Sequence, residues 1–228
     1  HRGTLTTHGL VKKQNRKLEI KLRNVEMFWS CLDIDLYPSK ELDALWKKLL
    51  INQFHDIIPG SSINLVYETT HQEYDQVHKG CDDLIKRASQ QLFSNSSDSF
   101  VLANTLSDSW KGVVDIPNSF KNYDVLDEKG NKIPTQLKDD SVIGLVDLPA
   151  LSFSSFTKGE KVERGVKTGK NLVLENGLVS YKFNDNGRLI KCFDKELNQD
   201  FLIDEGNIFS LYEDIPNNWD AWDIDFFY

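Results

Sequence analysis

A histidine followed directly by an aspartate is the residue pair in this sequence best suited to chemistry. His55 and Asp56 lie in Asn52–Ser62, whose sequence NQFHDIIPGSS contains the breaker pair Pro59 and Gly60. A neutral imidazole is a good zinc ligand, and a neighbouring carboxylate can orient a ligand or accept a hydrogen bond from a sugar hydroxyl. The competing interpretation is that His55 only interacts with the negative C-terminal end of a helix. Residue types alone favour that second interpretation, because a single His-Asp pair is weak support for a site.

A second group of candidate residues lies near the C-terminal end of the sequence, in the Trp-rich and Asn-rich stretch Pro216–Asp223. Tryptophan rings can stack on a sugar, and carboxylates can accept hydrogen bonds from its hydroxyls. Alternation supports equally well an interpretation in which Trp219 and Trp222 are core residues of a strand. His71 and His78 are weaker candidates for a metal site, because they are seven residues apart rather than four. We expect them on a solvated helix face.

The elements that must position these side chains begin with helices, because the first ninety or so residues have amphipathic spacing. Apolar residues recur every three or four positions between Leu18 and Leu32, between Leu42 and Leu50, and between Tyr74 and Leu92. Short connections separate the three patterns. We therefore expect an antiparallel three-helix bundle within residues 1–93.

Capping and breaker residues predict where these helices begin and end. Ser39 can cap the second helix, with Glu41 favourably placed in its first turn. That helix should end near Ile57–Gly60, which would place the His-Asp pair at its C-terminal end. Ser61 or Ser62 can then cap the third helix.

The pattern changes after Phe93, where a polar linker leads into short strands separated by turn residues. The first six strand candidates predict a small β-sandwich over residues 99–157, and a second linker is expected at Lys158–Lys161. Four more candidates lie in a unit over residues 170–228, which has too few strands to close a sheet. The candidates are 100–104, 112–116, 123–126, 133–137, 142–148 and 153–156, then 172–175, 178–183, 189–194 and 207–212. The expected fold class is α+β.

Composition limits the classes of protein that this chain could represent. The net charge of -8 argues against a nucleic-acid binder, and no apolar run is long enough to span a membrane. Cys31, Cys81 and Cys192 are odd in number and widely spaced, which indicates reduced thiols in a cytoplasmic protein. The glycosylation triplet Asn95–Ser97 is a weak signal against that location. The start at His1 has the character of neither a natural N-terminus nor a signal peptide.

Four segments, in the right order, resemble markers of the family 38 glycoside hydrolases, in the α-mannosidase clade of bacterial and cytosolic enzymes. Asn52–Ser62 is similar to the zinc-histidine motif of that family, and His1–Thr4 is similar to the HRGT stretch that closes its catalytic domain. Asn104–Trp110 resembles the NPLSW start of its small β domain, with Thr105 in place of the proline. Leu211–Asp223 resembles the DxPxxWDAWD segment of its large β domain. The resemblance covers essentially the whole chain and implies an internal piece of such an enzyme.

The resemblance implies roles for particular residues and for Zn²⁺ as the cofactor. His55 matches the histidine ligand of the zinc, and Asp56 matches the aspartate that contacts a mannose hydroxyl. The other zinc ligands, the nucleophile and the acid/base residue of the family lie upstream in a catalytic barrel, so no catalytic residue is expected here and the chain alone should be inactive. The candidate substrate-binding residues are Asp56 in the zinc-histidine segment and, in the Trp-rich C-terminal segment, Asp214, Trp219, Asp220, Trp222 and Asp223.

The whole enzyme implied by the resemblance is a retaining, zinc-dependent α-mannosidase that hydrolyses terminal α-mannosidic bonds of glycans with two carboxylates. Residues 170–228 would then hold the first strands of its large C-terminal β-sandwich. Two other interpretations stay open: a non-catalytic carbohydrate-binding module and a protein-interaction domain. An HxD motif and a barrel-like alternation of strands and helices upstream of His1 would favour the enzyme. The linkage that is cut and the formation of a homo-oligomer stay open as well.

Overall fold

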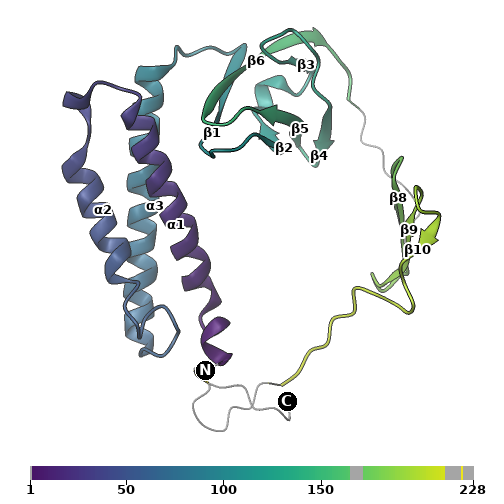
Figure 1. The fold of residues 1–228 in the computed structure, drawn as a ribbon, viewed down its shortest axis with the longest axis horizontal. Coiled ribbons are helices and arrows are strands. Elements are labelled where there is room, and N and C mark those ends of the chain that lie inside the picture. The colour runs from purple at the N-terminus through teal and green to yellow at the C-terminus, as the bar shows by residue number, and fades with distance from the viewer. Residues whose placement is uncertain (1, 165–171, 214–221, 223–228) are drawn as a thin grey trace. The chain divides into compact units, whose positions relative to one another are not determined.

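The computed structural model describes residues 2–164, 172–213 and 222, which fall into two compact units (Figure 1). Within the described residues, the first unit consists of 2–136, 141–162 and Trp222. The second unit consists of 137–140, 163–164 and 172–213. The α+β class predicted from the sequence is confirmed, since the described residues hold three long helices followed by antiparallel sheets.

Three helices in the first unit pack around one hydrophobic core. They are α1 (Gly9–Ser30), α2 (Ser39–Ile51) and α3 (Asn64–Leu92), with short 3-10 helices η1 (Arg2–Leu5) and η2 (Ile34–Leu36) beside them. Each helix contacts the other two. The core is the set of apolar side chains that lie on the facing stripes, as their three- and four-residue spacing predicts. Its buried members are Val11, Leu18, Leu22, Val25, Trp29, Leu42, Leu49, Tyr67, Tyr74, Val77, Cys81, Leu84 and Ala88.

The buried face of α2 is narrower than the sequence predicts. Leu42 and Leu49 are buried, but Leu50 is 54% exposed, so the prediction that it shares this face is wrong. Successive residues of a helix point about 100° apart, so Leu50 turns away once Leu49 faces the core.

The predicted start and end of α2 and the predicted cap of α3 are also wrong. Hydrogen bonds between side chains and the backbone contribute to where a helix ends, and the sequence does not reveal them. The residue before the first turn of α2 is Pro38, and Ser39 is already helical. The helix ends at Ile51 rather than near Ile57–Gly60, and buried Asn52 donates from Nδ2 to the Lys48 carbonyl at 2.8 Å. Helix α3 begins at Asn64 without a side-chain cap, so neither Ser61 nor Ser62 caps it.

Two small sheets complete the described part of the first unit. One sheet has the order β1-β6-β3 and the other has the order β2-β5-β4. Phe100 stacks on Phe156 at a ring-centroid distance of 5.2 Å and meets the edge of Phe120 at 4.9 Å, which centres the core of this region. The strands are β1 (Ser99–Asn104), β2 (Trp110–Ile116), β3 (Tyr123–Leu126), β4 (Thr135–Lys138), β5 (Ser141–Leu148) and β6 (Ser152–Lys161), with the 3-10 helix η3 (Asn118–Phe120).

The segment Lys158–Lys161 corrects the sequence analysis, because it is the end of β6 and not a linker. Lys158 is the register partner of Val125 in β3, and its ammonium lies 3.0 Å from Asp98. The same ammonium lies about 5 Å above the ring of Tyr123. A lysine can occupy a strand in this way because its apolar stem covers aromatic surface while its charge finds a carboxylate.

The helices and the sheets of the first unit contact each other directly. The Arg23 guanidinium donates to the Thr105 carbonyl at 2.9 Å, and the Thr105 hydroxyl donates to the Asn24 side chain at 2.9 Å. The Phe153 ring meets the rings of Phe28 and Phe93 edge-on. The threonine at position 105 therefore makes a contact to α1 that a proline could not make.

The second unit is a four-stranded antiparallel sheet with the order β10-β9-β8-β7. A tight turn joins the second and third strands, with Gly187 at φ 74° and its amide donating to the Asn184 carbonyl. The predicted strand at 207–212 is wrong, since pairing after Asp200 is limited to a bridge between Leu189 and Gly206 within the described residues. The strands are β7 (Val173–Glu175), β8 (Val179–Phe183), β9 (Leu189–Asp194) and β10 (Gln199–Asp200).

Candidate functional site

The His-Asp pair lies on the loop between α2 and α3, which we call the HD loop (residues 52–63). Its backbone is a series of turns, in which the amides of Ile57 and Ile58 donate to the Phe54 carbonyl at 2.9 and 3.1 Å. The side chains of His55 and Asp56 are 77% and 47% exposed. Both are therefore accessible to a metal or to a sugar from outside this chain.

The local contacts of His55 leave its ring available. Its Nε2 atom lies 3.6 Å from Asp56 Oδ2, which is too long for a good hydrogen bond, and its ring centroid lies 4.2 Å from that of Phe54. Asn52, not His55, donates to a carbonyl in the last turn of α2. The interpretation of His55 as a helix-end histidine thus finds no support in the hydrogen bonds of the described residues.

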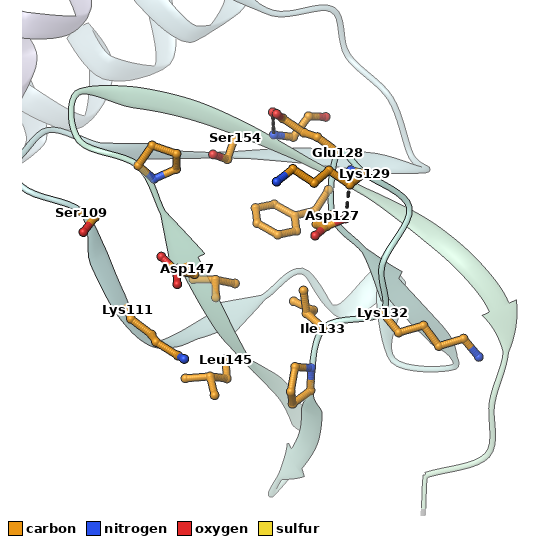
Figure 2. Close-up of a pocket in the computed structure, with 15 residues that line it drawn as sticks. Ser109, Lys111, Asp127, Glu128, Lys129, Lys132, Ile133, Leu145, Asp147 and Ser154 are labelled. Atoms are coloured by element: carbon orange, nitrogen blue, oxygen red, sulfur yellow. Dashed lines mark hydrogen bonds between the residues drawn. The ribbon is translucent and has the colours of Figure 1, made fainter.

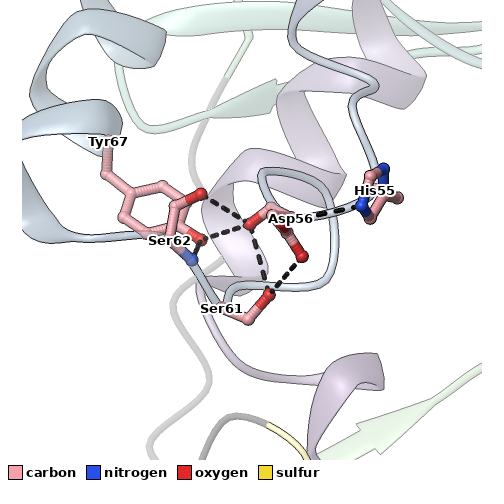
Figure 3. A network of polar contacts seen from close by, with 5 residues as sticks. All are labelled: His55, Asp56, Ser61, Ser62 and Tyr67. Carbon is pink, nitrogen blue, oxygen red and sulfur yellow. Dashed lines mark hydrogen bonds and ion pairs between the residues drawn. The ribbon is translucent and has the colours of Figure 1, made fainter.

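The backbone carbonyl of Asp56 accepts hydrogen bonds from side chains of the HD loop itself and of α3 (Figure 3). The Ser62 hydroxyl donates to it at 2.8 Å, and the hydroxyls of Ser61 and Tyr67 lie at 3.4 and 3.3 Å. The Tyr67 oxygen in turn accepts a hydrogen bond from the Ser62 amide at 3.0 Å. These contacts fix the backbone beneath the exposed pair.

The N-terminal segment packs against the other side of this network. The His8 ring stacks on the Tyr67 ring at a centroid distance of 3.7 Å. Burial, followed by the charges of Lys12 and His71, lowers the pKa of His8. Gly60 has φ 97°, and a Cβ there would lie 2.7 Å from Thr7 Cγ2, so only glycine fits without a shift.

Trp222 is the candidate of the C-terminal group that the structure describes. It is partly exposed, and its carbonyl accepts a hydrogen bond from the Gly3 amide at 3.0 Å. The N-terminal segment, which contacts the HD loop through Thr7 and α3 through His8, therefore also contacts Trp222. The other four candidates of this group lie outside the described residues: Asp214, Trp219, Asp220 and Asp223.

Exposed apolar side chains are concentrated at the same end of the three helices. Seven large ones belong to the segments that meet there, on η1, on the first turns of α1 and α3, and around the end of α2. Solvated surfaces rarely expose so many apolar groups together, which marks this end as a surface built for contact. The seven are Leu5, Leu10, Leu50, Ile51, Phe54, Ile63 and Leu65, each more than half exposed, and we call them the apolar end.

Side chains that commonly bind metal ions are scattered among the described residues. No group of three or more His, Cys, Asp or Glu side chains converges among them. His55 fits a zinc site as one ligand of a shared set, because an accessible imidazole nitrogen is a suitable donor but a structural or catalytic zinc takes at least three protein ligands. The three cysteines are free, and Cys81 is a core residue whose burial raises the pKa of its thiol to about 11.

His78 corrects the expectation of a solvated face on α3. One of its ring nitrogens lies 3.0 Å from Gln14 Oε1 and the other lies 3.5 Å from the Lys21 ammonium, both on α1. Burial first, and then the charge of Lys21, lowers its pKa. His78 is therefore a polar contact between helices and not a free ligand.

A groove between the strands of the first unit is a second candidate site (Figure 2). It has a volume of about 680 Å³ and lies beside the register partners Lys111 of β2 and Asp147 of β5. The Glu128 carboxylate, on the turn after β3, accepts a hydrogen bond from the Ser155 amide at 2.7 Å and so forms part of its wall. The groove offers both charges and several hydroxyls, but none of its lining residues is a histidine or a cysteine.

Sequence reasoning missed Tyr67 and assigned a different role to the two serines of the HD loop. Ser61 and Ser62 were expected as helix caps, whereas their hydroxyls bond Asp56. One signal could have indicated Tyr67: it lies seven residues before Tyr74, on the same stripe of α3. Its hydroxyl partners could not be read from that spacing.

Comparison with known families gives two matches along the chain. Residues 1–92 match the alpha mannosidase middle domain, and residues 174–228 match the glycosyl hydrolases family 38 C-terminal domain. The two matches thus include the HD loop and the Trp-rich segment, the two places where candidate residues were identified.

Curated relatives match almost the entire chain. It is 29% identical to human alpha-mannosidase 2C1 over 98% of its own length, 27% identical to alpha-mannosidase G of Dictyostelium discoideum over all of it, and 28% identical to the alpha-mannosidase of Saccharomyces cerevisiae, again over all of it. The chain spans 21%, 25% and 19% of the lengths of these three relatives.

Solved structures agree in fold. An alpha-mannosidase from Enterococcus faecalis V583 superposes with a TM-score of 0.62 at 21% identity, covering 87% of this chain and 29% of that one. A family 38 glycosyl hydrolase from Enterococcus faecalis gives a TM-score of 0.63 at the same identity, covering 87% of this chain and 30% of that one. With both domain matches falling in one family and in the expected order, the chain belongs to glycosyl hydrolase family 38.

Proposed function

We propose that this chain is part of a retaining, zinc-dependent α-mannosidase that hydrolyses terminal α-mannosidic bonds, and that it contributes His55 and Asp56 to the active site. The observation that supports the proposal most directly is the exposed His-Asp pair on a loop whose backbone is held by hydrogen bonds from Ser62 and Tyr67. The membership in family 38 gives that pair its chemical context.

The two side chains have different tasks in this proposal. His55 presents a neutral imidazole nitrogen as one metal ligand, and the Asp56 carboxylate accepts a hydrogen bond from a sugar hydroxyl. When bound, Zn²⁺ would supply a Lewis acid that binds sugar hydroxyls and stabilises charge. The two carboxylates that a retaining glycosidase requires, one as nucleophile and one as acid/base, are assigned to another part of the parent protein.

The exposed residues of the apolar end support an active site that is formed by this chain together with another part of the parent protein. Burying an exposed Ile, Leu or Phe side chain releases about 1.5–3 kcal/mol, so the seven around the HD loop favour a packed neighbour. We propose that the neighbour is the catalytic barrel of the parent protein. Its docking would cover the apolar side chains and bring the remaining ligands to His55.

We propose the domain organisation that the sequence analysis predicts. Residues 1–93 would hold the end of the catalytic domain and a three-helix bundle, residues 99–157 a small β-sandwich, and residues 170–228 the first strands of a large one. The last strand of the small sandwich, β6, continues past residue 157 to Lys161. None of the described helices is both long and apolar enough to cross a membrane. A cytoplasmic location is proposed from the three unpaired cysteines.

The experiment that tests the proposed function replaces His55 by alanine in the parent protein. Zinc content and hydrolysis of an aryl α-mannoside should fall by at least about 10- to 100-fold, the loss found when even an outer partner of a metal ligand is removed. The far-UV circular dichroism should not change, because the His55 side chain is exposed and packs little. His71→Ala, a histidine of α3, is the matched control and should retain zinc. Normal zinc content and turnover in H55A would refute the role of His55.

The groove beside Lys111 and Asp147 favours a second candidate function, a carbohydrate-binding module. In that case the isolated chain should bind an α-mannoside oligosaccharide, as measured by calorimetry, and Asp147→Ala should weaken that binding while His55→Ala leaves it unchanged. Absence of binding at millimolar sugar would exclude this candidate and leave the enzyme proposal intact.

A further inference from the structure

One carbonyl of the HD loop, that of Asp56, accepts its hydrogen bonds from side chains and not from the backbone of the loop. The turns of the loop satisfy the amides of Ile57, Ile58 and Gly60, but the Asp56 carbonyl accepts from side chains. A carbonyl near the base of a packed loop needs a donor, since leaving it unpaired costs stability. The groups that supply donors to this carbonyl also decide where the neighbouring His55 and Asp56 side chains point.

Tyr67 is the one of these groups that is anchored in the hydrophobic core. Its ring is almost fully buried in the helical core, and its hydroxyl is the point where the HD loop meets α3 (Figure 3). The oxygen accepts from the Ser62 amide at 3.0 Å, and its single proton can serve the carbonyls of Asp56 and Ile57, each at 3.3 Å. One rigid hydroxyl thus connects three backbone positions of the loop.

Tyr74 provides an internal comparison on the same helix. It lies two turns after Tyr67, is buried to the same degree, and belongs to the same core. Its hydroxyl makes no hydrogen bond with the described residues. The two tyrosines therefore differ in what their hydroxyl groups contact and not in how their rings pack.

We propose that Tyr67 is a positioning residue of the active site, whose hydroxyl holds the HD loop so that His55 and Asp56 meet metal and sugar in the right place. This role rests on the proposed function of the loop. Loss of the hydroxyl leaves the Ser62 amide without a partner and the Asp56 carbonyl dependent on serine hydroxyls. The loop would then sample other conformations, and only a fraction of molecules would be competent to bind.

The test is Tyr67→Phe in the parent protein, with Tyr74→Phe as the matched control. In the metal-free protein, hydrogen exchange at the amides of Ile57, Ile58 and Gly60 should be about fivefold faster in Y67F, the fold-change that corresponds to one lost hydrogen bond. Zinc affinity should fall and KM for an aryl α-mannoside should rise by a similar factor, with kcat nearly unchanged, because the affected contact is made equally in the ground state and the transition state. Ser62→Ala should change the same quantities in the same direction. Y74F should match the unmodified protein in all of them.

Two results would overturn the proposal. If exchange in the HD loop is the same in Y67F and Y74F, the hydroxyl does not hold the loop. If exchange is faster but zinc affinity and KM are unchanged, the loop is held for stability only. The exchange measurement does not depend on zinc, whereas the His55→Ala measurement does. Failure of the proposed function is thereby distinguished from failure of this inference.

Discussion

Gly60 shows how a single residue can fix the position of a functional loop. Its φ of 97° is accessible to glycine at little cost, and an added Cβ would lie 2.7 Å from Thr7 Cγ2 and 2.9 Å from the Thr7 carbonyl oxygen. The second of these atoms is backbone and cannot rotate away. The contact between the N-terminal segment and the HD loop therefore depends on the absence of a side chain at position 60.

The expected consequence is a loss of stability in Gly60→Ala that exceeds the cost of positive φ alone. Gly130 is the control, since it has φ 79° and nothing within 4 Å of its hypothetical Cβ. Gly130→Ala should lower the free energy of unfolding by ~1 kcal/mol and Gly60→Ala by about 2–4 kcal/mol, because strain and a clash add. Denaturant unfolding followed by circular dichroism and by tryptophan fluorescence measures both. Equal losses would show that the Thr7 contact relaxes without cost.

His78 makes the stability of the helical region dependent on pH. Its pKa is lowered in the folded chain, by burial first and then by Lys21, so the folded state takes up a proton less readily than the unfolded one, whose histidine titrates near 6.5. The unfolded state binds more protons below about pH 6.5, and stability therefore falls as the pH falls through that value. Above it, His78 is neutral in both states and its contribution is fully present.

We expect His78→Gln to reduce this acid sensitivity. Glutamine can still bond Gln14 and accept from Lys21, but it takes up no proton. The free energy of unfolding of the unmodified chain should fall more than that of the variant between about pH 7.5 and about pH 5. Denaturant titrations across this range measure the difference. Parallel curves for the two proteins would mean that other groups account for the acid response.

At the scale of elements, two neighbouring leucines of α2 differ in burial but not in helix propensity. Leu49 is fully buried among the three helices, whereas Leu50 is 54% exposed. Leu49→Ala should cost ~2–5 kcal/mol through lost contacts and a cavity, and Leu50→Ala should stay within about 0.5 kcal/mol in the isolated chain. Both substitutions gain the same helix propensity, so thermal unfolding of the pair reports burial alone. Similar shifts in melting temperature would contradict the orientation of α2.

Interiors of helices and strands could be predicted from the sequence, whereas their ends could not. The stripe Leu18–Trp29 repeats a hydrophobic period over several turns, which is a strong local signal. The end of α2 depends instead on Asn52 bonding the Lys48 carbonyl, which propensity does not encode. The linker expected at Lys158–Lys161 failed for a similar reason, because ring contacts and Asp98 offset the polarity of Lys158.

The residues of the candidate site also fall into those that the sequence predicts and those that it does not. His55 and Asp56 could be singled out because their chemistry and their sequence context are both visible in one short segment. Tyr67 could not, since its function depends on two carbonyls and an amide that the fold brings to its hydroxyl. A sequence therefore points to the groups that face a ligand more readily than to those that hold them in place.

At the scale of the whole molecule, the distribution of exposed apolar residues along the helices is uneven. The apolar end surrounds the HD loop, and the opposite end carries Ile34 and Leu36 between α1 and α2. Docking of a catalytic barrel onto the apolar end would make exposed side chains there behave as buried ones in the parent protein. Exposed residues at the opposite end would keep their surface character.

One isoleucine from each end of the helices can be replaced both in the isolated chain and in the parent protein. Ile51 at the end of α2 is 65% exposed, and Ile34 in η2 is 78% exposed. In the isolated chain, Ile51→Gln and Ile34→Gln should each change the free energy of unfolding by less than about 0.5 kcal/mol. In the parent protein only Ile51→Gln should destabilise, by roughly 1.5–3 kcal/mol, because it alone would place a polar group in a packed interface. Differential scanning calorimetry of the four proteins gives the comparison. If both substitutions are neutral in the parent, the apolar end is not covered there, and the division of the active site between this chain and a barrel loses its structural support.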